Sequence, residues 1–161
     1  MQSILFGRRP RRTLMRAAIL IAVSAAVFGW ILIPIRTQGI SMQPTFDPGG
    51  FHFVNRLAFA RRPPARGDVI GIRLAGPGVM YVKRIVGLPG ERVRIDGGVV
   101  LVNDEPLDEP YVKNRSPSWS LPETALGADE YFVVGDNRGM AIGQHELGRA
   151  KRGRIVGKVV F

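Results

Sequence analysis

The hydrophobic pattern divides the chain into one long apolar run and a series of shorter, alternating stretches. Residues 17–35 contain no charged side chain and consist mainly of Ala, Ile, Val and Leu. A helix of that length spans about 28 Å, close to the ~30 Å hydrocarbon thickness of a bilayer. We therefore predict a transmembrane anchor at residues 17–35 and an extramembrane domain at residues 36–161.

Two other structures fit the apolar run less well. A cleaved signal peptide has a shorter apolar core that ends in a small-x-small pair, but Ser24, Ala25 and Ala26 lie in the middle of this run. A buried core helix would show an amphipathic face, and the run has none. The run is therefore predicted to remain as an anchor.

Beyond residue 66 the chain becomes a succession of short apolar stretches separated by glycine-rich turns, such as the turn at residues 75–78. Short strands with turns about every 8 to 12 residues indicate an antiparallel β-barrel or β-sandwich, so we predict an all-β domain. Residues 103–128 contain several prolines and are expected to be a loop. The predicted strands cover residues 68–74, 79–86, 92–95, 99–102, 131–134 and 154–161.

The charge of the chain is strongly positive and unevenly placed. The formal net charge is +10, and five of the arginines lie within residues 1–16, which contain no acid. Such a tail is predicted to stay on the cytoplasmic side of a membrane. The remaining positive charge is dispersed, so we expect contact with membrane lipid and no nucleic-acid partner.

The residue types present exclude several kinds of chemistry. The chain has no cysteine, so it has neither a disulfide framework nor a thiolate site. It has two histidines and no H-E-x-x-H motif, so we predict no metal site and no cofactor.

A serine lies in irregular backbone shortly after the apolar run. Ser41 begins the sequence Ser-Met-Gln-Pro-Thr, between Gly39 and the Asp-Pro-Gly-Gly sequence at residues 47–50. Glycine and proline on both sides predict a loop. By itself Ser41 would be interpreted as a turn cap, although a serine just outside a bilayer is also well placed to meet a substrate that leaves it.

A lysine lies in the strand predicted at residues 79–86. Alternate residues of a strand share a face, so Lys83 lies between Tyr81 and Ile85 on one face. Burial lowers the pKa of a lysine, and a neutral amine is a competent general base for a serine hydroxyl. The alternative is a lysine that extends from an edge strand into solvent.

Other catalytic arrangements have less support. A Ser-His-acid triad would need His52 or His145, with Asp136 or Glu146 to orient the ring, and the spacing does not favour it. Residues 135–139 could form a phosphate-binding loop, but their acid and their single arginine argue against it.

Several segments together resemble the type I signal peptidases, which are membrane-bound Ser–Lys endopeptidases. They occur in the family's order and, with the anchor, cover nearly the whole chain. The matching segments are residues 39–45 around the serine, 67–70, 81–91 around the lysine, 102–111, 133–138 and 154–158.

The resemblance implies catalytic roles for individual residues. Ser41 would be the nucleophile, with its own N–H in the oxyanion hole, and Lys83 would be the general base. Arg84 and Asp136 would form an ion pair that supports the lysine strand. Some family members carry a second oxyanion donor two residues before the nucleophile, where this chain has Gly39.

The resemblance also implies the substrate and the location. Met42, Phe46, Tyr81 and Val82 match residues that line shallow pockets for small side chains at positions −1 and −3 of signal peptides. The expected protein is a monomer with a single membrane span in the cytoplasmic membrane, whose coiled β-barrel domain faces outward and cleaves exported preproteins.

The chain departs from the family in the segment that follows residue 138. Ala141 occupies the position of a serine that hydrogen-bonds the base lysine, and Gly143 and His145 replace an Asp–Arg pair. Two hypotheses therefore stay open. The first is an active signal peptidase. The second is a membrane-tethered β domain of the same fold with lost activity or a single substrate.

Overall fold

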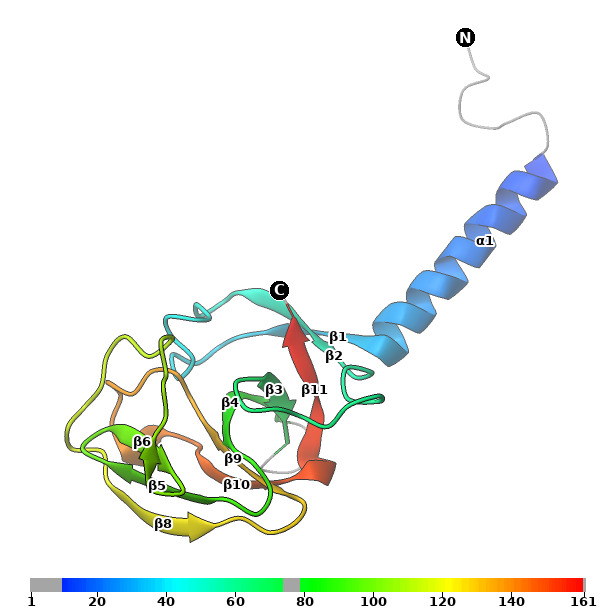
Figure 1. Cartoon of the computed structure of the whole chain (residues 1–161). Coiled ribbons are helices and arrows are strands. Elements are labelled where there is room, and N and C mark those ends of the chain that lie inside the picture. Colours follow the sequence, from blue (N-terminus) through cyan, green and yellow to red (C-terminus); the bar gives the residue numbers. More distant parts are fainter. Residues whose placement is uncertain (1–9, 74–78, 161) are drawn as a thin grey trace.

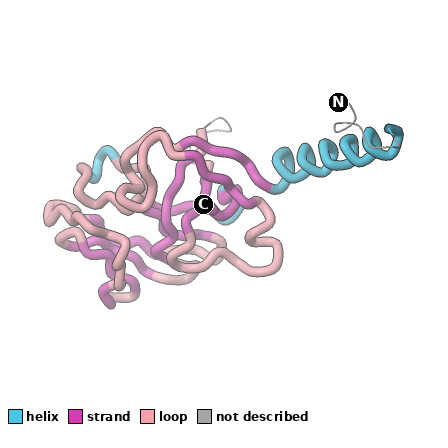
Figure 2. Tube along the Cα trace, turned by 90° about the horizontal axis from the view of Figure 1, so that it is seen from above, coloured by secondary structure: helices cyan, strands magenta, loops and turns pink. Residues whose placement is uncertain are grey.

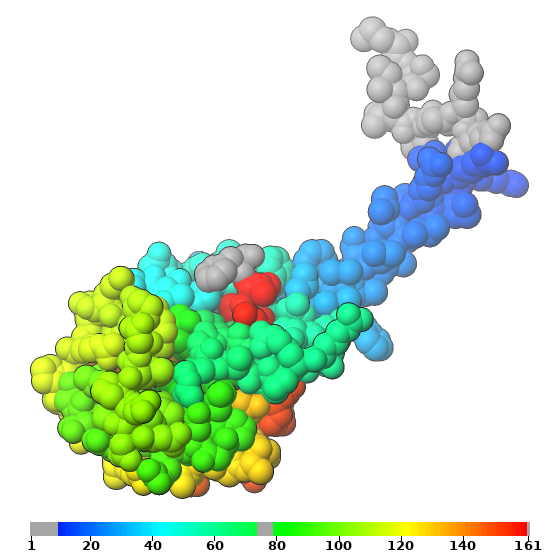
Figure 3. Space-filling view, viewed as in Figure 1, coloured from blue at the N-terminus to red at the C-terminus, as the bar shows by residue number. Residues whose placement is uncertain are grey.

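The structure is a computed structural model that describes residues 10–73 and 79–160. It consists of one long N-terminal helix and a β domain, and the helix projects away from the domain (Figure 1). Helix α1 covers Pro10–Ala26, and a π-helical segment, Val27–Ile31, extends it. Figures 2 and 3 show that the helix stands clear of the domain, and no residue of α1 is buried.

The helix is long and apolar enough to cross a membrane, but its limits differ from the predicted 17–35. It begins at Pro10, so part of the expected tail is helical, whereas residues 1–9 lie outside the described residues. It ends at Ile31, and Leu32–Arg36 form strand β1. Pro34 explains the early end, since proline has no N–H to donate and favours extended backbone in the residue before it.

The domain is built from two antiparallel sheets, which confirms the predicted all-β class. The larger has the order β1-β2-β11-β3-β4-β9-β10 and the smaller β7-β6-β5-β8, and every strand pairing is antiparallel. The strands after β1 are β2 (Phe51–Asn55), β3 (Val69–Ile72), β4 (Tyr81–Gly87), β5 (Arg92–Asp96), β6 (Val99–Val102), β7 (Glu105–Pro106), β8 (Leu121–Ala125), β9 (Glu130–Val134), β10 (Gly148–Lys151) and β11 (Ile155–Val160).

The predicted strands β3, β4, β5, β6, β9 and β11 are present, but the predicted loop at 103–128 is wrong in part. It contains β7 and β8, and both lie at edges of the smaller sheet. An edge strand tolerates proline because one side of its backbone needs no partner, which explains Pro122 within β8. Strands β2 and β10 also lie outside the predicted strands. The predicted turn at 75–78 lies outside the described residues.

The core has separate parts that follow from the two faces of β4. Val86 packs with Val93 and Trp119 between the two sheets, whereas Ile85 packs with Ile70 on the other face of β4. The residues at 85 and 86 thus point to opposite sides, as the alternation predicts. A third cluster, which includes Met42, Phe46 and Val54, lies where the segment between β1 and β2 meets the large sheet.

A buried ion pair joins the long connection before β8 to the end of β9. Glu109 and Arg138 have fully buried side chains and contact each other through two hydrogen bonds. Glu109 also accepts hydrogen bonds from Arg115 and from the Tyr111 hydroxyl. Arg138 donates in addition to Gly135 O at 2.8 Å. The pair therefore fixes the backbone immediately after β9.

We expect Glu109→Ala to lower the free energy of unfolding by about 3–5 kcal/mol, because the Arg138 charge would stay buried without a carboxylate. Urea titration of the detergent-solubilised chain measures this. Replacing both partners, in the Glu109→Leu/Arg138→Met variant, should cost less than Glu109→Ala alone. Glu123→Ala breaks an exposed ion pair with Arg92 and serves as the matched control, with a loss of about 0–1 kcal/mol. Equal losses in Glu109→Ala and Glu123→Ala would contradict the argument.

Candidate active site

The segment between β1 and β2 is a loop closed at its base by Thr37. The Thr37 N–H donates to Gly50 O at 3.0 Å, and the Thr37 hydroxyl donates to Asp47 O at 2.6 Å. Gly49 N–H donates back to Thr37 O. Ser41 lies in a run of turns within this loop, in agreement with the irregular backbone predicted for it. We call residues 37–50 the serine loop.

The segment after β9 holds the serine loop from a second side. Asn137 N–H donates to Ser41 O at 3.0 Å, and the Asn137 side-chain amide donates to Ile40 O at 3.1 Å. Gly135 permits this approach, since a Cβ there would collide with Ser41 O. Sequence reasoning placed Asn137 in a matching segment but gave it no role.

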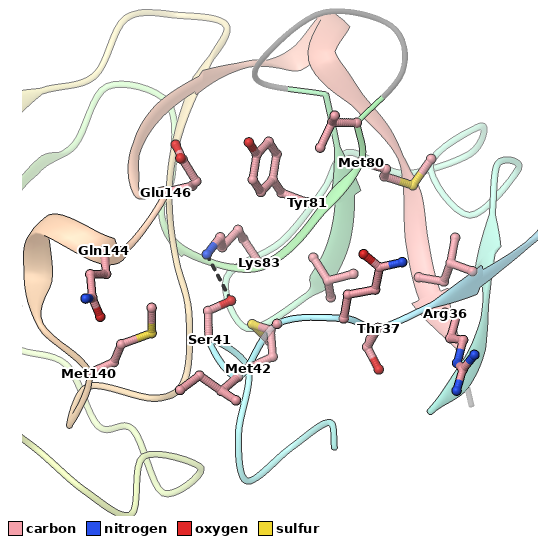
Figure 4. A pocket seen from close by; sticks show the side chains of 16 residues that line it. Arg36, Thr37, Ser41, Met42, Met80, Tyr81, Lys83, Met140, Gln144 and Glu146 are labelled. Carbon is pink, nitrogen blue, oxygen red and sulfur yellow. Dashed lines mark hydrogen bonds between the residues drawn. The ribbon is translucent and has the colours of Figure 1, made fainter. Parts of the chain in front are cut away.

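Lys83 lies beside Ser41, as the paired motifs predict. Its Nζ donates to Ser41 Oγ at 3.1 Å (Figure 4). Lys83 is only 2 % exposed, and it faces Ile70 across the β3–β4 pairing. Burial lowers the pKa of the ammonium to about 8, and the negative charges of Glu146 and Asp136 limit that fall. A lysine with this pKa is neutral far more often near neutral pH than an exposed lysine, whose pKa is ~10.4.

Asp136 connects the lysine strand to the serine loop. It accepts two hydrogen bonds from the Arg84 guanidinium, at 2.9 and 2.6 Å, and one from the Thr45 hydroxyl. The expected Arg84–Asp136 ion pair is thus present, and the Asp136 side chain is fully buried. Arg84 also lies over the Tyr111 ring, 3.8 Å from its centroid. Asp136 therefore joins Arg84, which follows Lys83 in β4, to Thr45 of the serine loop.

A cavity of about 640 Å³ opens at the Ser41–Lys83 pair. Met42, Tyr81 and Val82 line it, as do Met80 and Ile35. These five side chains form the apolar part of the cavity. Met42 and Met80 lie to the right of the Ser41–Lys83 pair in Figure 4, and Tyr81 lies above Lys83.

Two residues expected in the site lie elsewhere. Phe46 is 2 % exposed and belongs to the core cluster that includes Met42, so it does not line the cavity. Ala141 is exposed and is also absent from the cavity lining. Ala141 begins a 3-10 turn at residues 142–144, and that turn brings Gln144, not Ala141, to the cavity.

Sequence reasoning gave Glu146 no role with Lys83. Its carboxylate lines the cavity with Met140 and Gln144, on the side away from Met42 (Figure 4). The signal in the sequence is weak, because an exposed glutamate after a histidine is common. Only the turn that follows residue 141 brings this charge near the Lys83 amine.

Neither histidine is arranged as a base for Ser41. The His145 ring contacts Asn137 O through Nε2 at 2.8 Å and packs edge-on against Trp119. Burial lowers the pKa of His145 to about 4, although the hydrogen bond to Asn137 opposes this, so the ring is neutral and donates to the carbonyl. The His52 ring packs edge-on against Phe46. The triad alternative therefore has no geometric support.

The fold and the site define an antiparallel β protein in which a buried lysine meets a serine on a closed loop. A family model described as "Signal peptidase, peptidase S26" matches residues 11–161. The chain therefore belongs to the signal peptidase family.

Named relatives agree with this assignment. The chain is 34% identical to signal peptidase I of Leptolyngbya laminosa over 74% of its own length and 63% of the relative's. It is also 34% identical to signal peptidase I of Bacillus caldolyticus, over 77% and 75% of the two lengths. A crystal structure of a signal peptidase I from Enterococcus faecalis V583 superposes with a TM-score of 0.51 at 25% identity, covering 62% of this chain and 98% of the other. The chain spans less than two thirds of the length of the Leptolyngbya relative.

We expect Glu146→Gln to lower the pKa of Lys83 below about 8, because the lost negative charge no longer stabilises the ammonium. Titration of 13C-labelled lysine by NMR in detergent micelles reports the pKa directly. Glu105→Gln, which removes an exposed carboxylate on β7, is the matched control and should leave the value unchanged. An unchanged or higher pKa in Glu146→Gln would show that the carboxylate does not act on the amine.

Proposed function

We propose that the chain is a serine endopeptidase that removes signal peptides from exported preproteins, with Ser41 as nucleophile and Lys83 as general base. The observation that carries this proposal is the 3.1 Å contact between Lys83 Nζ and Ser41 Oγ, made by an amine that is almost fully buried. Membership of the signal peptidase family supports the same reaction.

In the first half of the proposed reaction, neutral Lys83 accepts the proton of the Ser41 hydroxyl while Oγ attacks the scissile carbonyl carbon. The negative charge then develops on the carbonyl oxygen. The Ser41 N–H is a suitable donor to it, because it makes no hydrogen bond within the described parts of the chain. One such donor is worth ~2.7–4 kcal/mol in related acyl transfers.

In the second half, the Lys83 ammonium gives its proton to the departing amine, and the amide C–N bond breaks. The acyl group stays on Ser41 Oγ until a water molecule attacks the ester carbon while the neutral amine accepts the water's proton. The ester C–Oγ bond then breaks, and the Lys83 ammonium returns the proton to Ser41 Oγ, which releases the acid product. The lysine thus serves as base twice and as acid twice. Asp136 takes no proton in this scheme. It accepts hydrogen bonds from Arg84, the neighbour of Lys83, and from Thr45 of the serine loop.

The apolar part of the cavity favours small uncharged side chains before the cleaved bond. Met42 and Val82 offer no hydrogen-bonding group to a large polar residue, and a charged side chain would lose its hydration there. Phe46 packs with Met42 in the core behind this wall.

The long apolar helix supports a site close to a membrane surface. Ser41 follows the last helical residue, Ile31, by one short strand and the first residues of the serine loop. The basic residues before the apolar run favour a cytoplasmic N-terminus, so the β domain would face outward. The proposed protein is a monomer with one membrane span. Signal peptides that leave the bilayer would then reach Ser41 directly.

A second candidate is a membrane-tethered β domain that has lost its activity or acts on one dedicated substrate. The observation that favours it is that Ser41 is the one hydrogen-bond partner of the Lys83 amine among the described residues, so no second side chain orients the amine. Cleavage of a generic preprotein separates the two candidates.

Ser41→Ala and Lys83→Ala should each reduce preprotein cleavage to the background rate, since the first lacks the nucleophile and the second lacks the base. The measurement is cleavage of a purified preprotein with Ala at −1 and −3, by the full chain in detergent. His52→Ala should keep activity and provides the control. Full activity in Lys83→Ala would refute the Ser–Lys assignment, and a wild-type chain without activity would favour the tethered domain.

Gly39→Ser should raise kcat by about tenfold, because a hydroxyl there can serve as a second oxyanion donor. A Cβ at Gly39 meets nothing within 4 Å, so the substitution has space. Gly39 lines the same cavity as Ser41. Gly39→Ala is the matched control, with the Cβ but no hydroxyl, and should resemble the wild type. Equal kcat values for the two variants would exclude a donor at this position.

A further inference from the structure

A second cavity, of about 540 Å³, lies where the helix joins the β domain. Three arginines line it, Arg56, Arg73 and Arg154, and no acidic residue is among the described residues of its lining. The apolar side chains of Ile33 and Val156 complete the wall. This cavity is separate from the one at Ser41, with which it shares no residue.

The three guanidinium groups are not neutralised by protein carboxylates. Within residues 10–73 and 79–160, none of the three forms an ion pair, although many other arginines of the domain do. The one side-chain hydrogen bond among them is a long one, from Arg154 to Arg73 O at 3.5 Å. All three side chains are exposed, so most of their N–H donors are available to a ligand.

The backbone holds the three arginines together around the hollow. Arg73 N–H donates to Arg154 O at 3.1 Å, which joins the end of β3 to the start of β11. Arg56 N–H donates to Ile31 O at 2.9 Å, which ties the end of β2 to the last helical residue. Like charges collected in this way repel one another, and an anion bound between them would remove that repulsion.

The position of the cavity relative to the helix identifies the source of the anion. Ile31 ends the apolar helix, and the neighbouring Trp30 is 77% exposed, as is typical of a tryptophan at a membrane–water interface. The Arg56 N–H is hydrogen-bonded to Ile31 O, so we expect the cavity to lie at the level of the lipid headgroups. This step depends only on the membrane anchoring in the proposed function and is independent of which side the domain faces.

We propose that this cavity binds the phosphate group of an anionic phospholipid from the adjoining leaflet. Guanidinium groups bind phosphate oxygens through paired N–H donors, and three of them suit a phosphodiester better than a single carboxylate. Ile33 and Val156 provide an apolar border for the part of the lipid that continues toward the bilayer. The bound headgroup would fix the β domain against the membrane surface.

The test uses the full chain in dodecyl maltoside micelles, with dioctanoyl phosphatidylglycerol as the probe and native mass spectrometry to count bound lipid. We expect the Arg56→Gln/Arg73→Gln/Arg154→Gln variant to bind the probe at least tenfold more weakly than the wild type. The wild type should also prefer phosphatidylglycerol to dioctanoyl phosphatidylcholine. Unchanged lipid binding in the triple variant would overturn the proposal.

A charge-matched variant separates a site from a general effect of net charge. Arg61→Gln/Lys113→Gln/Arg149→Gln removes the same charge from exposed residues outside the cavity lining and should keep wild-type binding. An equal loss in both variants would overturn the proposal. Thermal unfolding of each variant identifies any loss of fold, and the single variant Arg56→Gln, expected to be intermediate, then gives the test.

Two further arms distinguish the source of the phosphate and the dependence on catalysis. Inorganic phosphate that displaces the probe at equal concentration would make this a phosphate site and refute the lipid assignment. Preprotein cleavage is measured on the same wild-type sample. Cleavage without lipid preference overturns this inference alone, whereas lipid preference without cleavage overturns the proposed reaction alone.

Discussion

The site depends on keeping one amine out of water while a serine stays beside it. Lys83 is a buried residue of β4, and its amine lies beside Ser41 Oγ at the cavity. Burying an ammonium without a partner is unfavourable, so burial shifts the equilibrium toward the neutral amine relative to water. The surrounding strands supply that burial, because Ile70 and Ile85 belong to the core on the same face. The chemistry of the site is thus a consequence of β-sheet packing.

A fixed lysine is useful only if the serine is equally fixed, and the serine lies on a loop. Three sets of contacts restrain that loop: Thr37 at its base, Asn137 against the Ser41 carbonyl, and Asp136 through Thr45. Asp136 also binds Arg84, the neighbour of Lys83. Segments far apart in the sequence therefore set one 3.1 Å contact, and the buried Glu109–Arg138 pair steadies the segment that joins them.

The segment after residue 138 departs from the family pattern and brings different side chains to the cavity. At the position of the expected serine, Ala141 points to solvent, and the short turn after it presents Gln144 and Glu146 to the cavity instead. A carboxylate near the amine acts in the opposite direction to burial, so the pKa of Lys83 settles between the two effects. His145, in place of a charged residue, is neutral and packs against Trp119, where a permanent charge would need a partner.

The sequence by itself determined the β class, the long apolar helix, the loop around Ser41 and the face of β4 that carries Lys83, because these follow from local patterns of apolar residues, glycines and prolines. It also indicated the Arg84–Asp136 pair through resemblance. Only the tertiary structure decided that Phe46 is core, that Ala141 is exposed, and that Glu146 and three scattered arginines line cavities. Those features depend on which distant segments pack together, and side-chain alternation within one segment carries no information about the partner segment.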